Sequence, residues 1–159
     1  MLGEKMMNSC LNVLLEFGVN DGFLAQQKYT FIPEVMILAP KLCPQVYKKV
    51  IRLVNDPLCC CGFCAYVAIG TTYLWHTDFA TFQKADIMSV LEEPRGFDYM
   101  DEYITDMTGF DHSKIEKHLQ MASVVAIGNT EDVKSNFDKC LETMFNYGMV
   151  LEMNKLGLR

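Results

Sequence analysis

Four cysteines crowd into one short stretch of the chain, and thiolates are side chains that bind metal ions and carry redox chemistry. They are Cys59, Cys60, Cys61 and Cys64, in the run Cys-Cys-Cys-Gly-Phe-Cys. Residues three and four apart share one face of a helix, so Cys60 and Cys61 both point the same way as Cys64. Zinc and iron–sulfur clusters bind such thiolates. One hypothesis is therefore a zinc or iron–sulfur site at Cys60, Cys61 and Cys64.

This metal site needs a fourth ligand from elsewhere in the chain. His76 is a poor candidate, because twelve residues of continuous helix place it about 18 Å from Cys64. The sequence contains no second CxxC pair and no HxxxH pair. The candidates that the fold can bring close are Cys10, Cys43, Cys140, His112 and His118.

Redox chemistry and simple packing are the alternatives for the same cysteines. Cys61 and Cys64 form a CxxC motif, and a thiol near a helix N-terminus has a lowered pKa. Thioredoxin-like motifs, however, follow a β-strand, whereas the segment before this one has a helical pattern that ends at Asn55. Free cysteine is also a small, usually buried residue. We favour close packing of the cysteine run inside a core helix.

The helix that carries the cysteines is predicted over residues 57–77. Asp56 fits the N-cap position and Pro57 the first helical turn. No charged residue lies between Asp56 and Asp78. The length suits a membrane span, but glycines, threonines and His76 lower its hydropathy and no basic cluster flanks it. We therefore expect no membrane span but a central helix that is surrounded by the others.

Helical periodicity dominates the rest of the chain. It predicts an all-α fold: a single compact bundle of about six or seven helices around the central apolar helix, in one domain over residues 1–159. A short strand at residues 28–32 stays open. The other predicted helices cover residues 6–17, 34–39, 44–55, 81–92, 97–107, 113–127 and 130–155.

Three local features predict helix ends and contacts. Gly18 fits the residue that follows the first helix, where left-handed backbone is common. Ser113 and Glu116 have the spacing of a capping box. Gly148 lies within the last helix, where glycine costs about 1 kcal/mol relative to alanine, so we expect either a kink or a close helix contact there.

An acidic stripe lies along the predicted helix over residues 97–107. Its members are Asp98, Asp101, Glu102 and Asp106. The stripe is either a docking surface for a basic partner or an ordinary solvated helix face. The spacing does not match the loop of an EF-hand.

Composition narrows the classes of function. The chain has 159 residues, with 14 basic and 20 acidic residues and a net charge of −6, which argues against binding nucleic acid or anionic lipid. Its seven cysteines, without a secretory signal, indicate a reducing compartment, and we expect a cytoplasmic protein. Phosphate loops, GxSxG elbows and HExxH motifs do not occur.

These observations favour a non-enzymatic helical binding or regulatory module that acts through protein–protein interaction, with no cofactor. The alternative is the thiol-based metal-binding or redox protein described above. A ligand cavity inside the bundle, lined by methionines and aromatic side chains, is a third possibility. The sequence does not identify the partner, and a homo-oligomer stays open.

Overall fold

The computed structural model describes residues 2–53, 55–84, 87–92 and 99–158, with backbone alone at 2–8 and 90–92. This part of the chain folds into helices and contains no strand, so the predicted all-α bundle is confirmed and the segment at 28–32 is not a strand. The helices are α1 (Leu2–Asn20), α2 (Pro33–Met36), α3 (Ala39–Leu53), α4 (Pro57–Thr77), α5 (Phe79–Lys84), α6 (Ile87–Glu92), α7 (Met100–Thr108), α8 (His112–Gly128) and α9 (Phe137–Lys155).

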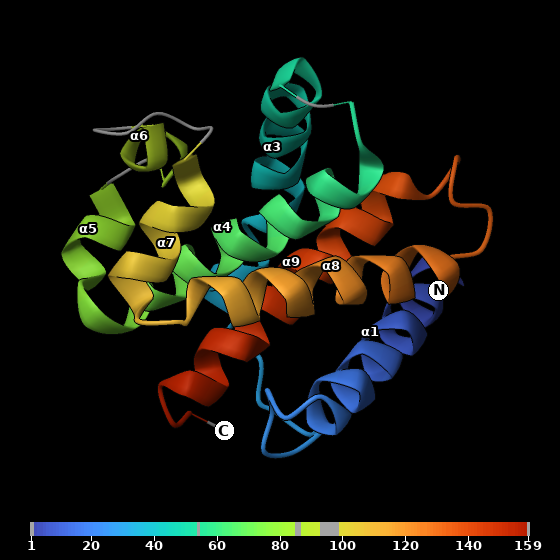
Figure 1. Cartoon of the computed structure of the whole chain (residues 1–159), viewed down its shortest axis with the longest axis horizontal. Coiled ribbons are helices and arrows are strands. Elements are labelled where there is room, and N and C mark those ends of the chain that lie inside the picture. Colours follow the sequence, from blue (N-terminus) through green and yellow to red (C-terminus); the bar gives the residue numbers. More distant parts are fainter. Residues whose placement is uncertain (1, 54, 85–86, 93–98, 159) are drawn as a thin grey trace.

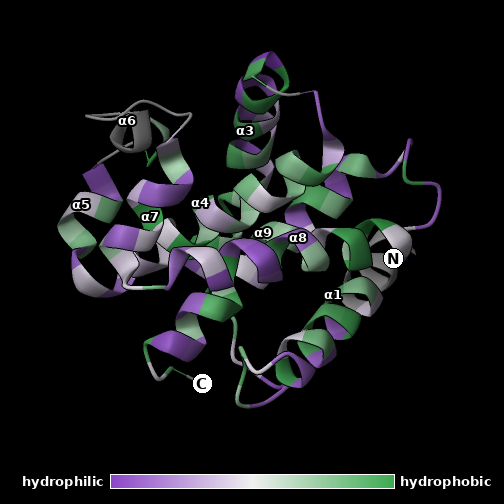
Figure 2. Cartoon of the chain, viewed as in Figure 1, coloured by the Kyte–Doolittle hydropathy of each residue, from purple (hydrophilic) through white to green (hydrophobic). Residues whose placement is uncertain are grey.

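Helix α4 is the centre of the bundle, as predicted. It crosses the middle of the molecule in Figure 1 and packs against α9, α8, α3, α7 and α5. Every residue from Cys64 to Thr72 is buried. Hydrophobic and near-neutral colours dominate α4 in Figure 2, because neighbouring helices cover it on all sides.

In length and composition α4 would also suit a membrane span. It is the one helix of this kind in the described part of the chain, and 67% of its most apolar window is buried against other helices. The core helix of a soluble protein has the same character, so this finding is weak evidence for a membrane.

Helix α9 makes the closest contact with α4. Gly148 lies against the backbone of Ala65, and a Cβ added at Gly148 would lie 2.8 Å from the Ala65 Cα and still closer to its carbonyl oxygen. The glycine therefore lets the two helices approach closely. Of the two alternatives for Gly148, the close helix contact is confirmed.

The helix ends confirm one cap and correct another. The Asp56 carboxylate accepts a hydrogen bond from the Leu58 N–H at 2.9 Å, as predicted. The capping box at Ser113 is wrong. Asp111 caps α8 by accepting from the Lys114 N–H at 3.2 Å, and the Ser113 hydroxyl donates to the same carboxylate at 3.0 Å. A carboxylate two residues earlier thus takes the capping role.

Two predicted ends in the first third of the chain are also wrong. Gly18 lies inside α1, where an added Cβ would lie 2.7 Å from the Leu24 side chain, and Gly22 has the left-handed backbone instead, with φ of 81°. Helix α3 begins at Ala39 rather than Pro44, because a proline within the first turns removes only one intrahelical hydrogen bond.

The last helix begins at Phe137, later than predicted. Residues 129–136 form turns, in which the Asn136 side chain donates to the Glu131 carbonyl at 2.8 Å. The predicted helix over 81–92 corresponds to α5 and α6, with residues 85–86 outside the described part. Residues 97–98 also lie outside it, and the described helix there is α7.

Candidate functional site

The cysteines proposed as metal ligands are buried, and two of them face thiols on other helices. The Sγ atoms of Cys61 and Cys140 lie 4.0 Å apart between α4 and α9. Cys64 lies against Cys43 of α3, and Cys60 is 2% exposed. Cys61 and Cys64 therefore pair with cysteines of two different helices.

Their surroundings also oppose ionisation. Burial raises the pKa of Cys60 to about 11. A hydrogen bond with Cys140 and burial raise the pKa of Cys61, and burial raises that of Cys64. Protonated, enclosed thiols are poor nucleophiles. Across the described residues no group of three or more His, Cys, Asp or Glu side chains is placed to hold a metal ion. The metal and redox hypotheses gain no support and stay predictions.

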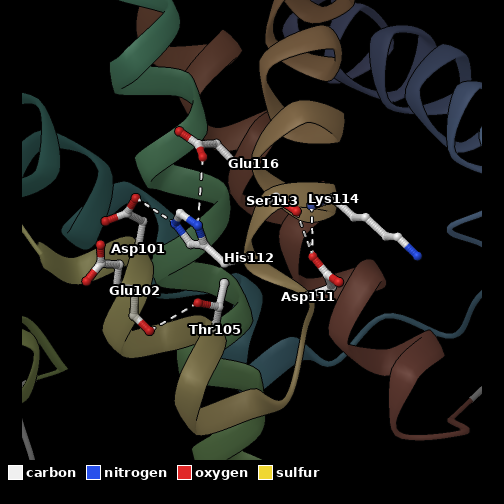
Figure 3. A network of polar contacts seen from close by, with 8 residues as sticks. All are labelled: Asp101, Glu102, Thr105, Asp111, His112, Ser113, Lys114 and Glu116. Atoms are coloured by element: carbon white, nitrogen blue, oxygen red, sulfur yellow. Dashed lines mark hydrogen bonds and ion pairs between the residues drawn. The ribbon is translucent and has the colours of Figure 1, made fainter.

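One member of the acidic stripe, Asp101, interacts with a histidine of α8. Figure 3 shows the His112 ring between two carboxylates: Nε2 lies 3.1 Å from Asp101 Oδ2, and Nδ1 lies 3.8 Å from Glu116 Oε2. The hydrogen bond to Asp101 raises the pKa of His112. Asp101 thus ties α7 to α8. Glu102 and Asp106 are exposed, and Asp98 lies outside the described residues.

A polar network that sequence reasoning missed surrounds the second histidine of α8. His118 Nδ1 lies 2.6 Å from Asp21 Oδ2, and Nε2 lies 2.6 Å from the Tyr147 hydroxyl. The ring stacks with Phe17 and Phe23, at centroid distances of 5.0 and 4.1 Å. Asp21 and His118 are 97 residues apart in the sequence, so no local pattern could reveal their contact.

This network is a structural tie, although its residue types resemble a catalytic relay. Burial lowers the pKa of His118, so the neutral ring donates from Nδ1–H to Asp21 and accepts at Nε2 from Tyr147. Tyr147 is 0% exposed and packs at the centre of the bundle. A substrate therefore has no path to its hydroxyl, and the network joins the end of α1 to α8 and α9.

A groove lies between α3 and the first turns of α9 and continues to the start of α4, and we call it the α3/α9 groove. It consists of two cavities of about 520 and 330 Å³. Tyr47 and Phe137 line both cavities, and their rings meet edge to face at 6.0 Å. The larger cavity is also lined by Pro40, Cys43, Pro44, Lys48, Asp138, Leu141 and Glu142. The smaller one is also lined by Ile51, Asn55, Asp56, Pro57, Cys60, Ile127, Val133 and Lys134.

Helix α3 contributes a second apolar stripe to this groove. One face of the helix is buried, through Leu42, Cys43, Val46 and Val50. Another face is exposed and carries Pro40, Pro44, Tyr47 and Ile51, at spacings of four, three and four residues. Tyr47 and Ile51 are each 38% exposed. An amphipathic helix needs only one apolar face to join a core, so the second stripe is available for another contact.

The acids of the larger cavity lie on α9. Asp138 and Glu142 are four residues apart, on one face of the helix. Burial raises the pKa of Glu142, and the negative charge of Asp138 raises it further. Within the described residues neither carboxylate forms an ion pair. Lys48 lies on the opposite wall.

The groove was missed for a physical reason. Part of its wall comes from segments in which the periodicity misplaces a helix start: Pro40 and Cys43 precede the predicted start at Pro44, and residues 133–134 form turns where a helix was predicted. The stripe of α3 was readable in principle, because Pro40, Pro44, Tyr47 and Ile51 recur at helical spacing.

Comparisons with known proteins found no match: no protein-family model, curated protein or solved structure matches the chain. Function has to be argued from the site itself.

Proposed function

We propose that this protein is a non-enzymatic helical module that acts by binding another protein, and that the α3/α9 groove receives an amphipathic α-helix of that partner. The observation that carries the proposal is the exposed apolar stripe of α3 along the groove. Helix-in-groove recognition buries apolar side chains at i, i+3, i+4 and i+7 of the incoming helix.

The spacing of the stripe favours a helix over an extended peptide. Pro40, Pro44, Tyr47 and Ile51 recur with the alternation of four and three residues that helices use when they pack side by side. An extended strand binds by main-chain hydrogen bonds to an open sheet edge, and the described residues contain no strand.

The volumes of the two cavities also support a contact in which side chains of the partner fill the groove. The larger cavity has the volume of a ligand-sized pocket, and the smaller one continues it beyond Tyr47 and Phe137. Two large apolar side chains on one face of a partner helix would fill the two cavities. Well-packed pockets of this kind hold the anchor residues of protein interfaces.

The acidic stripe remains a weaker candidate for partner binding. Asp101 is engaged with His112, which leaves Glu102 and Asp106 as its exposed described members. Exposed acids on a helix face are ordinary, whereas exposed apolar side chains along a groove are not.

The test uses a display library of helix-forming peptides. Apolar residues are fixed at alternating spacings of three and four, and all flanking positions are randomised. The library is selected against the immobilised protein, and the affinity of the selected peptides is measured by fluorescence anisotropy. Wild type is compared with Tyr47→Lys and Ile51→Lys. Both positions are exposed, so circular dichroism and thermal melting should show a folded protein.

We expect each groove substitution to weaken peptide binding by about tenfold or more, equivalent to about 1.4 kcal/mol. The matched control is Val124→Lys on α8, which adds the same charge at an apolar residue that is 50% exposed, outside the groove. Its binding should equal that of wild type. A library that yields no peptide, or peptides whose binding is insensitive to both groove substitutions, would overturn the proposal.

A further inference from the structure

We infer that the partner helix carries a lysine or arginine that enters the larger cavity of the α3/α9 groove and pairs with Asp138 and Glu142. This inference rests on the proposed function and specifies the chemistry of the partner at that site. It follows from the charges, the rings and the apolar walls of the cavity.

The two carboxylates lack an ion-pair partner among the described residues, and the charge of the neighbouring Lys139 offsets only part of the rise in the pKa of Glu142. Like charges four residues apart on a helix repel each other. Glu142 is half-buried, so its ionised form loses part of its hydration as well. No ion pair relieves either residue within the described part of the chain. A cation placed between the two carboxylates would remove the repulsion and give each carboxylate an ion-pair partner.

The rest of the cavity suits the stem of a basic side chain. Pro40, Pro44 and Leu141 line it together with the rings of Tyr47 and Phe137. Lysine and arginine bury their methylene stems along apolar surface while the charged end reaches polar groups. Aromatic faces also attract a cation that is partly removed from water. The occupant is therefore a long side chain that is apolar along its stem and positive at its end.

Lys48 makes the two walls of the cavity differ in charge. It lies on the α3 wall, whereas both carboxylates lie on α9. A basic side chain of the partner is attracted to the α9 wall and repelled from the Lys48 side. The net charge of −6 would also attract a basic partner before contact. The sign of the charge thus fixes which flank of the partner helix faces α9.

The experiment uses the library selection described above and then single peptides. We expect lysine or arginine to be enriched at one flanking position. A selected peptide and its copy with glutamine at that position are then titrated against wild type and against Asp138→Asn/Glu142→Gln. The double variant keeps the side-chain shapes but removes both charges. The lysine or arginine peptide should bind the double variant about tenfold more weakly, whereas the glutamine peptide should not distinguish the two proteins.

A matched control separates local pairing from general electrostatics. Glu102→Gln/Asp106→Asn removes two exposed acids, also four residues apart, from α7. It should leave the discrimination between the two peptides unchanged. Equal loss in both double variants would show a long-range charge effect and overturn the inference.

Failure of this inference is distinguishable from failure of the proposed function. Peptides without an enriched basic residue, or equal binding of the two peptides to wild type, would overturn the inference alone if Tyr47→Lys still abolished binding. Absence of any binding that depends on Tyr47 would overturn the proposed function, and the inference with it.

Discussion

Helix α9 meets α4 without a gap but leaves a groove beside α3. Against α4 the contacting residues are small: Gly148 lies on the backbone of Ala65, and the thiols of Cys61 and Cys140 lie 4.0 Å apart. Against α3 the walls carry prolines and the rings of Tyr47 and Phe137, and a cavity of about 520 Å³ remains. The first contact belongs to the core of the fold, and the second is the surface that we propose binds a partner. The difference shows how residue size decides where one helix packs and where it stays open.

The largest effect on stability should come from adding a methyl group at the tight contact between α4 and α9. Gly148→Ala would place a methyl group against the backbone of Ala65, which cannot move aside as a flexible side chain can. We expect the free energy of unfolding to fall by about 3 kcal/mol or more, at the upper end of overpacking effects. Urea denaturation followed by circular dichroism would measure the loss.

The control for this substitution is Gly62→Ala in α4. A Cβ at Gly62 would have only the Ser123 hydroxyl oxygen near it, at 4.0 Å. Alanine should therefore raise stability by up to about 1 kcal/mol, because it is the better helix former. Equal effects of the two substitutions would mean that the α4–α9 contact is not tight.

An effect that depends on pH should come from the acid buried in α9. Glu152 is 0% exposed, neither carboxylate oxygen has a hydrogen-bond partner among the described residues, and burial raises its pKa from 4.5 to about 8. The folded protein therefore holds a proton that the unfolded chain has already released. Stability should be full below pH 4.5 and fall as pH rises towards 8, by at most about 1.4 kcal/mol per pH unit.

Glu152→Gln removes this titration. The variant should resemble wild type near pH 4.5 and be more stable than wild type at pH 8, as measured by urea denaturation at both values. Glutamine still leaves polar atoms without a partner, so the comparison concerns the slope with pH rather than the absolute stability. Parallel curves for the two proteins would contradict the assignment.

The next effect on stability concerns the hydrogen-bond network that joins α9, α8 and the end of α1. Tyr147→Phe removes the hydroxyl that bonds to His118 Nε2 and leaves a buried nitrogen without a partner. We expect a loss of about 1–3 kcal/mol in the free energy of unfolding. Tyr66→Phe is the matched control, because the Tyr66 hydroxyl is buried and already lacks a partner among the described residues. Its removal should be neutral or stabilising, and a similar loss in both variants would count against the tie.

The smallest effect on stability should come from the groove. Tyr47→Ser removes a ring that is 38% exposed and meets Phe137 edge to face, so thermal melting should show a change below about 1 kcal/mol. Substituting the same residue should weaken partner binding strongly. A loss of stability comparable to that of Gly148→Ala would show that the groove wall belongs to the core, and the contrast between the two sides of α9 would fail.

Local patterns were enough to predict the central helix. Asp56 and Pro57 mark its start, and the run without charge up to Asp78 follows from burial on all sides. The prediction succeeded because capping depends on neighbours along the chain and periodicity on a single helix. The same reasoning failed at Pro44, where the helix tolerates a proline near its start, and before Phe137, where turns replace the predicted helix.

The sequence therefore determined the helical class, the apolar central helix and the net negative charge of the chain, since these follow from residue type and short-range spacing. The tertiary structure alone decided that Cys61 faces Cys140, that His118 joins Asp21 to Tyr147, and that the stripe of α3 borders a cavity. Each of these contacts joins residues far apart in the chain. Their positions depend on how whole helices pack, which residue types and local spacing do not specify.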